Sequence, residues 1–259
     1  MHSRKSGRRP RGRWVKSANH VILEFMVSTA RVIEVFSSIQ GEGIYVGQPH
    51  LFVRFWDCNL ACQYCDTDYK GPYREYSIQE LLAQVRSRIA AEGPHHAVSL
   101  TGGEPLLWWK FLRDWLPQVK ALGQRIYLET NGVLHENLAQ LLRWVDIIAM
   151  DVKPPSATGD RAVWREHEQF LRAARQGAAE IFVKIVVTPQ TDDREMRQSA
   201  ELIAAVDRKI PLVLQPVTPW GPVQETPLQD QVDRWRREAS SLLTDVRVIP
   251  QVHRILGVR

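Results

Sequence analysis

The chain has 259 residues, of which 44% are hydrophobic, and this is enough to bury a sizeable core in one domain. No apolar run approaches the roughly 20 residues that a membrane-spanning helix needs. Glu24 interrupts the short apolar segment 21–27, which makes it a poor core for a signal peptide. Three cysteines provide no disulfide framework, so we expect a reducing, cytoplasmic setting.

The formal charge of +5 comes from the first 30 residues. Seven of the 34 basic residues and one of the 29 acidic residues lie there, which leaves residues 31–259 with a net charge of −1. This Arg-, Gly- and Pro-rich segment is typical of a disordered extension, so we predict one over 1–30 and a folded domain over 31–259. The near-neutral folded part does not favour a nucleic-acid partner. Met26, just before the first predicted strand, is an alternative start.

Strand-like and helix-like segments alternate along the rest of the chain. A predicted strand at 31–37 leads through the glycine-containing loop 38–43 and a hairpin-like return to a second strand at 50–56. Further strands are predicted at 97–100, 125–128, 146–150, 181–187, 211–214 and 246–249. Helices are predicted at 77–92, 106–122, 134–144, 162–176, 194–206 and 228–243. Ser77 and Glu80 fit a capping box at the start of the first helix.

This alternation predicts an α/β fold with a parallel sheet and right-handed crossovers. About six βα units are too few for a closed eight-stranded barrel. Polar or glycine-rich clusters follow nearly every strand, which favours an open, partial TIM-type barrel over a doubly wound sheet, because a barrel brings such strand ends to one rim. The clusters expected to meet there are 58–67, 101–105, 129–132, 151–153 and 215–217.

Cys58, Cys62 and Cys65 are the only cysteines, and they follow the second strand with the spacing C-x3-C-x2-C. Thiolates are soft-metal ligands, and three of them are one fewer than a closed zinc site or an ordinary iron–sulfur cluster requires. We therefore predict a 4Fe–4S cluster with one iron open to another ligand. The alternative is a zinc site completed by one of three histidines, His50, His95 or His253.

The cysteine spacing, together with Gly102-Gly103-Glu104-Pro105 after the next strand, resembles the radical S-adenosylmethionine (SAM) superfamily. The chain from 31 to 257 also resembles the family of 7-carboxy-7-deazaguanine synthases. The matching segments are 38–43, 52–54, 65–67, 129–132, 151–155, 214–217 and 250–253.

The resemblance implies a lyase that contracts the ring of 6-carboxy-5,6,7,8-tetrahydropterin to 7-carboxy-7-deazaguanine with loss of ammonia, in the biosynthesis of queuosine and other 7-deazapurines. It implies a 4Fe–4S cluster, SAM and Mg²⁺ as cofactors. It also implies an electron donor such as flavodoxin or ferredoxin, and a homodimer.

The same resemblance implies roles for individual residues. The cluster ligands are Cys58, Cys62 and Cys65, and Thr67 binds Mg²⁺. The residues expected to contact SAM are Tyr64, Asp66, Gly102, Gly103, Glu104, Asp151, Lys153 and Gln215. The residues expected to contact the substrate are Ile39, Gln40, Gly41, Glu42, Arg54 and Thr101, and the guanidinium of Arg54 suits a carboxylate. No general acid or base is assigned.

Simpler interpretations stay open for several of these residues. Thr67 fits a helix cap, Asp151 and Lys153 fit a surface ion pair, and Glu42 fits an exposed turn. Four histidines are expected to face solvent or cap helices, namely His95, His96, His135 and His167. An activase of a glycyl-radical enzyme is the alternative function, and a zinc-binding, RNA-associated module is a remoter one.

Overall fold

The computed structural model describes residues 29–258 of the chain. Almost all of the predicted basic extension, including the alternative start at Met26, lies outside the described residues. Thr29 and Ala30, which the prediction placed in that extension, are the first residues of a strand. Within 29–258, no helix is both long and apolar enough to cross a membrane.

A single nine-stranded sheet organises the described part of the chain, in the order β3-β1-β2-β4-β5-β6-β7-β8-β9. Its strands are β1 (Thr29–Ile39), β2 (Pro49–Phe55), β3 (Arg74–Ser77), β4 (Ala97–Gly102), β5 (Ile126–Thr130), β6 (Ile147–Asp151), β7 (Glu180–Val187), β8 (Leu212–Pro216) and β9 (Val246–Val248). The first strand, β1, is antiparallel to both β2 and β3, and every other pairing is parallel. The sheet does not close, which confirms the predicted open barrel.

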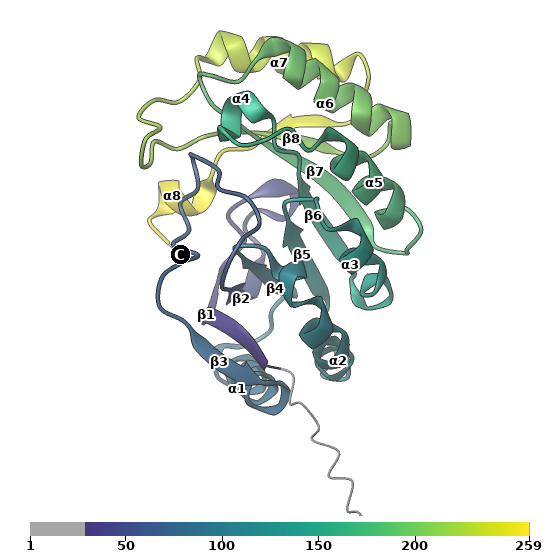
Figure 1. Ribbon diagram of the computed structural model, residues 1–259. Coiled ribbons are helices and arrows are strands. Elements are labelled where there is room, and N and C mark those ends of the chain that lie inside the picture. The colour runs from purple at the N-terminus through teal and green to yellow at the C-terminus, as the bar shows by residue number, and fades with distance from the viewer. Residues whose placement is uncertain (1–28, 259) are drawn as a thin grey trace, which may run out of the picture.

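Helices cover the outer side of this curved sheet, as Figure 1 shows for α2, α3, α5, α6 and α7. The helices are α1 (Ile78–Glu92), α2 (Trp109–Lys120), α3 (His135–Ala139), α4 (Pro155–Thr158), α5 (Trp164–Ala174), α6 (Asp193–Val206), α7 (Gln229–Ser240) and α8 (Val252–Leu256). Three single 3₁₀ turns are η1 (Gly43–Tyr45), η2 (Pro105–Trp108) and η3 (Leu142–Trp144). The predicted helix at 106–122 is thus a 3₁₀ turn followed by α2, and the one at 134–144 is α3 followed by η3.

The predicted capping box is confirmed at the start of α1. The Glu80 N–H donates to Ser77 Oγ at 3.3 Å, while Glu80 Oε2 accepts from the Ser77 N–H at 2.8 Å. Three short strands and helices, β3, α4 and α8, were not predicted. Each has only four or five residues. In addition, the pairing of β3 with β1 and the position of α8 depend on contacts with distant parts of the chain.

The inner face of the barrel changes from apolar to polar along the four strands β5 to β8. Side chains alternate between the two faces of a strand, so residues i and i+2 lie on the same face. Near the amino ends of the strands, apolar side chains that include Tyr127 and Phe182 pack into one cluster. Two residues further along each strand, a polar side chain faces the same interior. The pairs are Tyr127 and Glu129, Ala149 and Asp151, Phe182 and Lys184, and Val213 and Gln215.

Candidate active site

A cavity of about 560 Å³ lies at the carboxyl ends of the parallel strands. It is lined by the three cysteines and by nearly all the residues that the sequence singled out. These are Ile39, Gln40, Gly41, Glu42, Arg54, Cys58, Cys62, Tyr64, Cys65, Asp66, Thr67, Thr101, Gly102, Gly103, Asp151, Lys153 and Gln215. The expectation that strand ends meet at one rim is therefore correct, and only Glu104 of the predicted site residues does not line the cavity.

The loop that carries the cysteines begins against the backbone of the Gly-Gly segment. Asp57, just before the first cysteine, has a left-handed φ of 72° and accepts a hydrogen bond from the Glu104 N–H at 2.8 Å through its carbonyl. A Cβ on Gly103 would lie 1.8 Å from that carbonyl oxygen. No other residue fits at position 103 without displacing the cysteine loop, which explains the second glycine.

The three cysteines are free thiols that face one cavity. Burial raises the pKa of each, and that of Cys58 to about 11. Such thiols stay protonated at neutral pH unless a metal compensates for the buried negative charge. Three soft donors on one loop fit the three protein ligands of an open 4Fe–4S cluster.

The contacts of His50 and His95 argue against either histidine as the fourth ligand of a zinc site. The buried imidazole of His50 bonds Ser99 and His96, and His95 bonds Ser37. His253 lines the same cavity as the cysteines, and its ring packs against Gly41.

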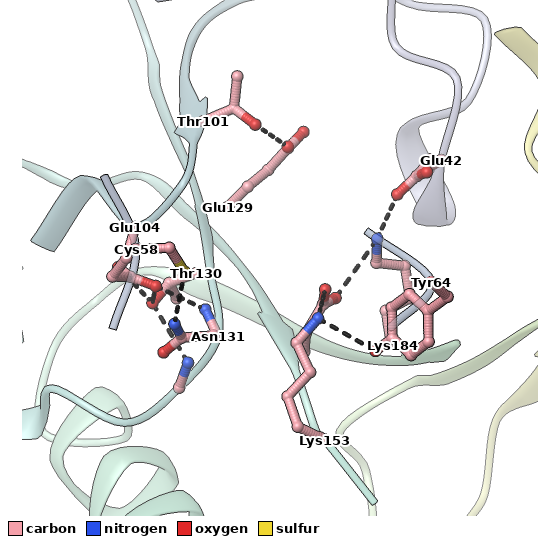
Figure 2. Close-up of polar contacts among 12 residues, drawn as sticks. Glu42, Cys58, Tyr64, Thr101, Glu104, Glu129, Thr130, Asn131, Lys153 and Lys184 are labelled. Carbon is pink, nitrogen blue, oxygen red and sulfur yellow. Dashed lines mark hydrogen bonds and ion pairs between the residues drawn. The ribbon is translucent and has the colours of Figure 1, made fainter. Parts of the chain in front are cut away.

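Glu104 corrects the sequence prediction, because its carboxylate turns away from the cavity. It is fully buried, and it accepts hydrogen bonds from the Leu106 N–H, the Thr130 hydroxyl and the Asn131 N–H at 2.8–3.0 Å. Burial raises its pKa to about 7 against the opposing effect of these bonds. The side chain therefore holds the segment after β5 in place, as the left half of Figure 2 shows.

Asp151 and Lys153 form an inward-facing ion pair and not a surface one. Their Oδ2 and Nζ atoms are 2.8 Å apart, the two side chains are 18% and 11% exposed, and Lys153 Nζ also lies 3.3 Å from the hydroxyl of Tyr64. Burial would lower the pKa of Lys153, but the surrounding acidic groups, with Asp151 the largest contributor, together outweigh burial and raise this pKa, so the ammonium stays charged.

A second buried cation, Lys184, pairs with Glu42 (Figure 2). It also lies 3.4 Å from Asp151. Burial alone would raise the pKa of Glu42, but Lys184 and a hydrogen bond from Gln251 lower it to about 2. The exposed-turn interpretation of Glu42 is therefore wrong. Lys184 was missed, although a single charged residue in the apolar strand IFVKIVV is a signal that could have identified it.

Arg54 and Thr67 lie together on the opposite part of the lining. Arg54 Nε donates to Glu34 at 2.9 Å, its Nη1 donates to Thr67 Oγ1 at 3.2 Å, and its guanidinium lies over the ring of Phe36. No helix begins near Thr67, since the next one starts at Ile78, so the helix-cap interpretation is wrong.

Glu129 joins two of the predicted substrate residues. Its carboxylate accepts from Gln40 Nε2 at 2.8 Å and from the Thr101 hydroxyl at 2.5 Å, and burial raises its pKa. The sequence placed Glu129 in a strand-end cluster but assigned it no role. Gln215 is fully buried at the cavity, and neither polar atom of its carboxamide has a hydrogen-bond partner among the described residues. Because an unpaired buried amide is costly, this side chain fits a site that a ligand completes.

The carboxyl-terminal segment lies over the cysteine loop, where Figure 1 shows α8 in yellow beside it. The Val252 N–H donates to the Gly41 carbonyl at 2.9 Å. Arg254 pairs with Asp66 at 2.7 Å, and its guanidinium lies 4.8 Å from the ring centre of Trp220. This contact between α8 and the cysteine loop was not predicted.

Comparisons with known proteins agree with this geometry. The model of the radical SAM superfamily matches residues 57–203. A 7-carboxy-7-deazaguanine synthase of Geobacter sulfurreducens is 40% identical over 254 residues, which cover 88% of this chain and 97% of that protein. The synthase of Methanothermobacter thermautotrophicus is 35% identical, covering 89% and 98%.

Solved structures share the fold. The crystal structure of QueE from Escherichia coli has a TM-score of 0.59 at 19% identity, covering 87% of this chain and 95% of that one. A radical SAM methyltransferase from Sphaerobacter thermophilus has a TM-score of 0.58 at 17% identity, covering 78% and 66%. The two synthases agree with the cysteine loop and the adjoining Gly-Gly segment at the strand ends. The chain therefore belongs to the 7-carboxy-7-deazaguanine synthase family of the radical SAM superfamily.

Proposed function

We propose that this enzyme contracts the ring of 6-carboxy-5,6,7,8-tetrahydropterin to 7-carboxy-7-deazaguanine with loss of ammonia. The product is a precursor of queuosine and other 7-deazapurines. The observation that carries the proposal is the single cavity that joins a three-cysteine loop to a polar inner face at the strand ends. When bound, the family's 4Fe–4S cluster and SAM supply radical chemistry, and Mg²⁺ supplies positive charge at the substrate carboxylate.

In this proposal, Cys58, Cys62 and Cys65 hold the cluster, and the adjoining strand ends hold SAM. The backbone of Gly102 and Gly103 approaches the methionine part, because neither residue has a side chain to keep it away. The remaining SAM contacts are Tyr64, Asp66, Asp151, Lys153 and Gln215. The unpartnered carboxamide of Gln215 supports a ligand at this position. The ion pair of Asp151 and Lys153 keeps both charges fixed at the cavity.

The substrate lies against the amino-terminal part of the lining, formed by Ile39, Gln40, Gly41, Glu42, Arg54 and Thr101. The hydrogen-bonded group of Gln40, Thr101 and Glu129 offers both donors and acceptors to the edge of a pyrimidine-like ring. Arg54 directs its guanidinium beside the hydroxyl of Thr67. We assign the substrate carboxylate to Arg54 and the Mg²⁺ that binds this carboxylate to Thr67.

The same proposal includes a small-molecule pterin substrate, an electron donor of the flavodoxin or ferredoxin type, a homodimer and a reducing, cytoplasmic setting. Free thiols at Cys58, Cys62 and Cys65 support the reducing setting.

The test is anaerobic turnover of the carboxytetrahydropterin with SAM and reductant, with and without Mg²⁺, followed by mass spectrometry of the product. We expect 7-carboxy-7-deazaguanine and deoxyadenosine with the pterin as the only added substrate. Thr67→Ala should weaken the response to Mg²⁺, while Thr67→Ser, which keeps the hydroxyl, should preserve it. Absence of both products from enzyme with a full complement of iron would overturn the proposal and favour the glycyl-radical activase.

A further inference from the structure

Asn131, the residue directly after β5, is held by its backbone from two sides. Its N–H donates to Glu104 Oε2 at 2.8 Å, and its carbonyl accepts from His167 Nε2 at 3.1 Å. Both Glu104 and His167 are fully buried, and Asn131 itself is 6% exposed. The sequence interpretation of His167 as a solvent-facing or capping residue is therefore wrong. This histidine on α5 instead fixes the end of a strand.

The orientation of the Asn131 carboxamide follows from a third contact. Its Oδ1 accepts from the Val133 N–H at 3.2 Å. Since a backbone N–H can only donate, the amide nitrogen must point the other way. There it lies 2.8 Å from Asn59 Oδ1 and 3.8 Å from Cys58 Sγ, both in the cysteine loop. Figure 2 shows Asn131 beside Cys58.

We propose that the side-chain amide of Asn131 donates a hydrogen bond to the Cys58 thiolate when that thiolate holds the cluster, and that this bond raises the reduction potential of the cluster. The proposal rests on the cluster assigned above to Cys58, Cys62 and Cys65. Reduction adds one electron from the external donor and breaks no bond. Part of the added negative charge resides on the sulfur atoms, so a donor directed at one of them stabilises the reduced state more than the oxidised one.

The surrounding contacts make Asn131 a positioning residue that acts through Cys58. Glu104, His167 and Val133 leave its side chain little freedom, so the donor is in place before the cluster binds. This arrangement also gives buried Glu104 a function: it holds the segment that carries the donor. Because the side chain of Asn131 is already fixed, it loses little conformational entropy when it donates to the thiolate.

The test is a potentiometric titration of the reconstituted holoenzyme without SAM or substrate, followed by electron paramagnetic resonance. Asn131→Leu removes the donor without adding charge. We expect the equilibrium constant for reduction to fall about tenfold, a shift of about 59 mV to more negative potential for one electron. Asn59→Ala is the matched control, since it removes the other partner of the same amide. We expect Asn59→Ala to keep the wild-type potential.

A wild-type potential for N131L at full iron content would overturn the proposal, and so would an equal shift for N59A. If N131L does not retain the cluster, Asn131→Asp is measured instead, because it removes the donor but keeps the acceptor for the Val133 N–H. Its control is Asn59→Asp, which adds the same charge but keeps the donor on Asn131. A larger negative shift for N131D than for N59D supports the proposal. Equal shifts, or loss of the cluster from both Asn131 variants, would overturn it. Because no pterin is present, failure here is distinct from failure of the proposed function.

Discussion

Substitution of Lys184 by methionine tests the charge arrangement of the cavity. The ammonium of Lys184 is 13% exposed and lies between two carboxylates, those of Glu42 and Asp151. Methionine keeps most of the side-chain volume and removes the charge. Lys184→Met therefore leaves Glu42 and Asp151 partly buried, with one neutralising cation fewer between them.

The expected cost follows from this burial. Removing one partner of a buried ion pair costs about 3–5 kcal/mol. Because Glu42 is 20% exposed and so only partly buried, we expect the lower end, about 3 kcal/mol. Burial is already the largest single effect on the pKa of Glu42, and Lys184 is the main group that opposes it, so without Lys184 this pKa should rise from about 2. In wild type, ionised Glu42 contributes stability above its unfolded pKa of 4.5, and this contribution is lost only as the pH falls through about 2. In Lys184→Met the same contribution is lost at a higher pH.

Urea denaturation at neutral pH measures the effect, and Lys120→Met is the matched control. The ion pair of Lys120 with Asp146 is 2.7 Å long, but both side chains are about 30% exposed, so its loss should cost about 0–1 kcal/mol. The double variant K184M/E42Q should recover part of the loss, because it removes one uncompensated charge. Equal destabilisation by K184M and K120M would refute the reasoning, and so would no recovery in the double variant.

Three further outcomes are expected. Gly103→Ala should lose most of the cluster iron, because the new Cβ would lie 1.8 Å from a backbone oxygen. Gly177→Ala, whose Cβ would have its nearest neighbour at 3.2 Å, should retain the iron. Equal iron contents in the two variants would contradict this. Burial lowers the pKa of His50 to about 3, so this histidine is protonated near pH 6 only in the unfolded state. The stability advantage of wild type over His50→Gln should therefore shrink by about 1–2 kcal/mol as the pH falls from 6.5 to about 5. A difference in stability that does not change with pH would exclude this. Arg254→Ala breaks an ion pair with Asp66 in which the two side chains are 31% and 30% exposed, so the free energy of unfolding should change by about 0–1 kcal/mol while KM for SAM rises. An unchanged KM would argue against a role for α8 at the site.

The errors made from the sequence have a common physical origin. Glu104 directly follows two glycines that line the cavity, and nothing local reveals that its carboxylate turns back toward the segment after β5. His167 was misjudged for the same reason, because its partner is a backbone carbonyl 36 residues away. Contacts of this kind depend on which strand ends become neighbours, and a one-dimensional pattern does not contain that information.

The sequence by itself determined the class of chemistry and the architecture. Three cysteines on one loop need no partner from elsewhere to indicate an open cluster, and strand–helix alternation predicts strand ends that share a rim. Only the tertiary structure decided how the polar side chains are paired. It placed Lys184 between Glu42 and Asp151, seated α8 beside the cysteine loop, and directed the amide of Asn131 at Cys58. The first arrangement arises because neighbouring strands contribute side chains to a common interior in the register of the sheet. The other two arise because segments that follow different strands meet at the same rim.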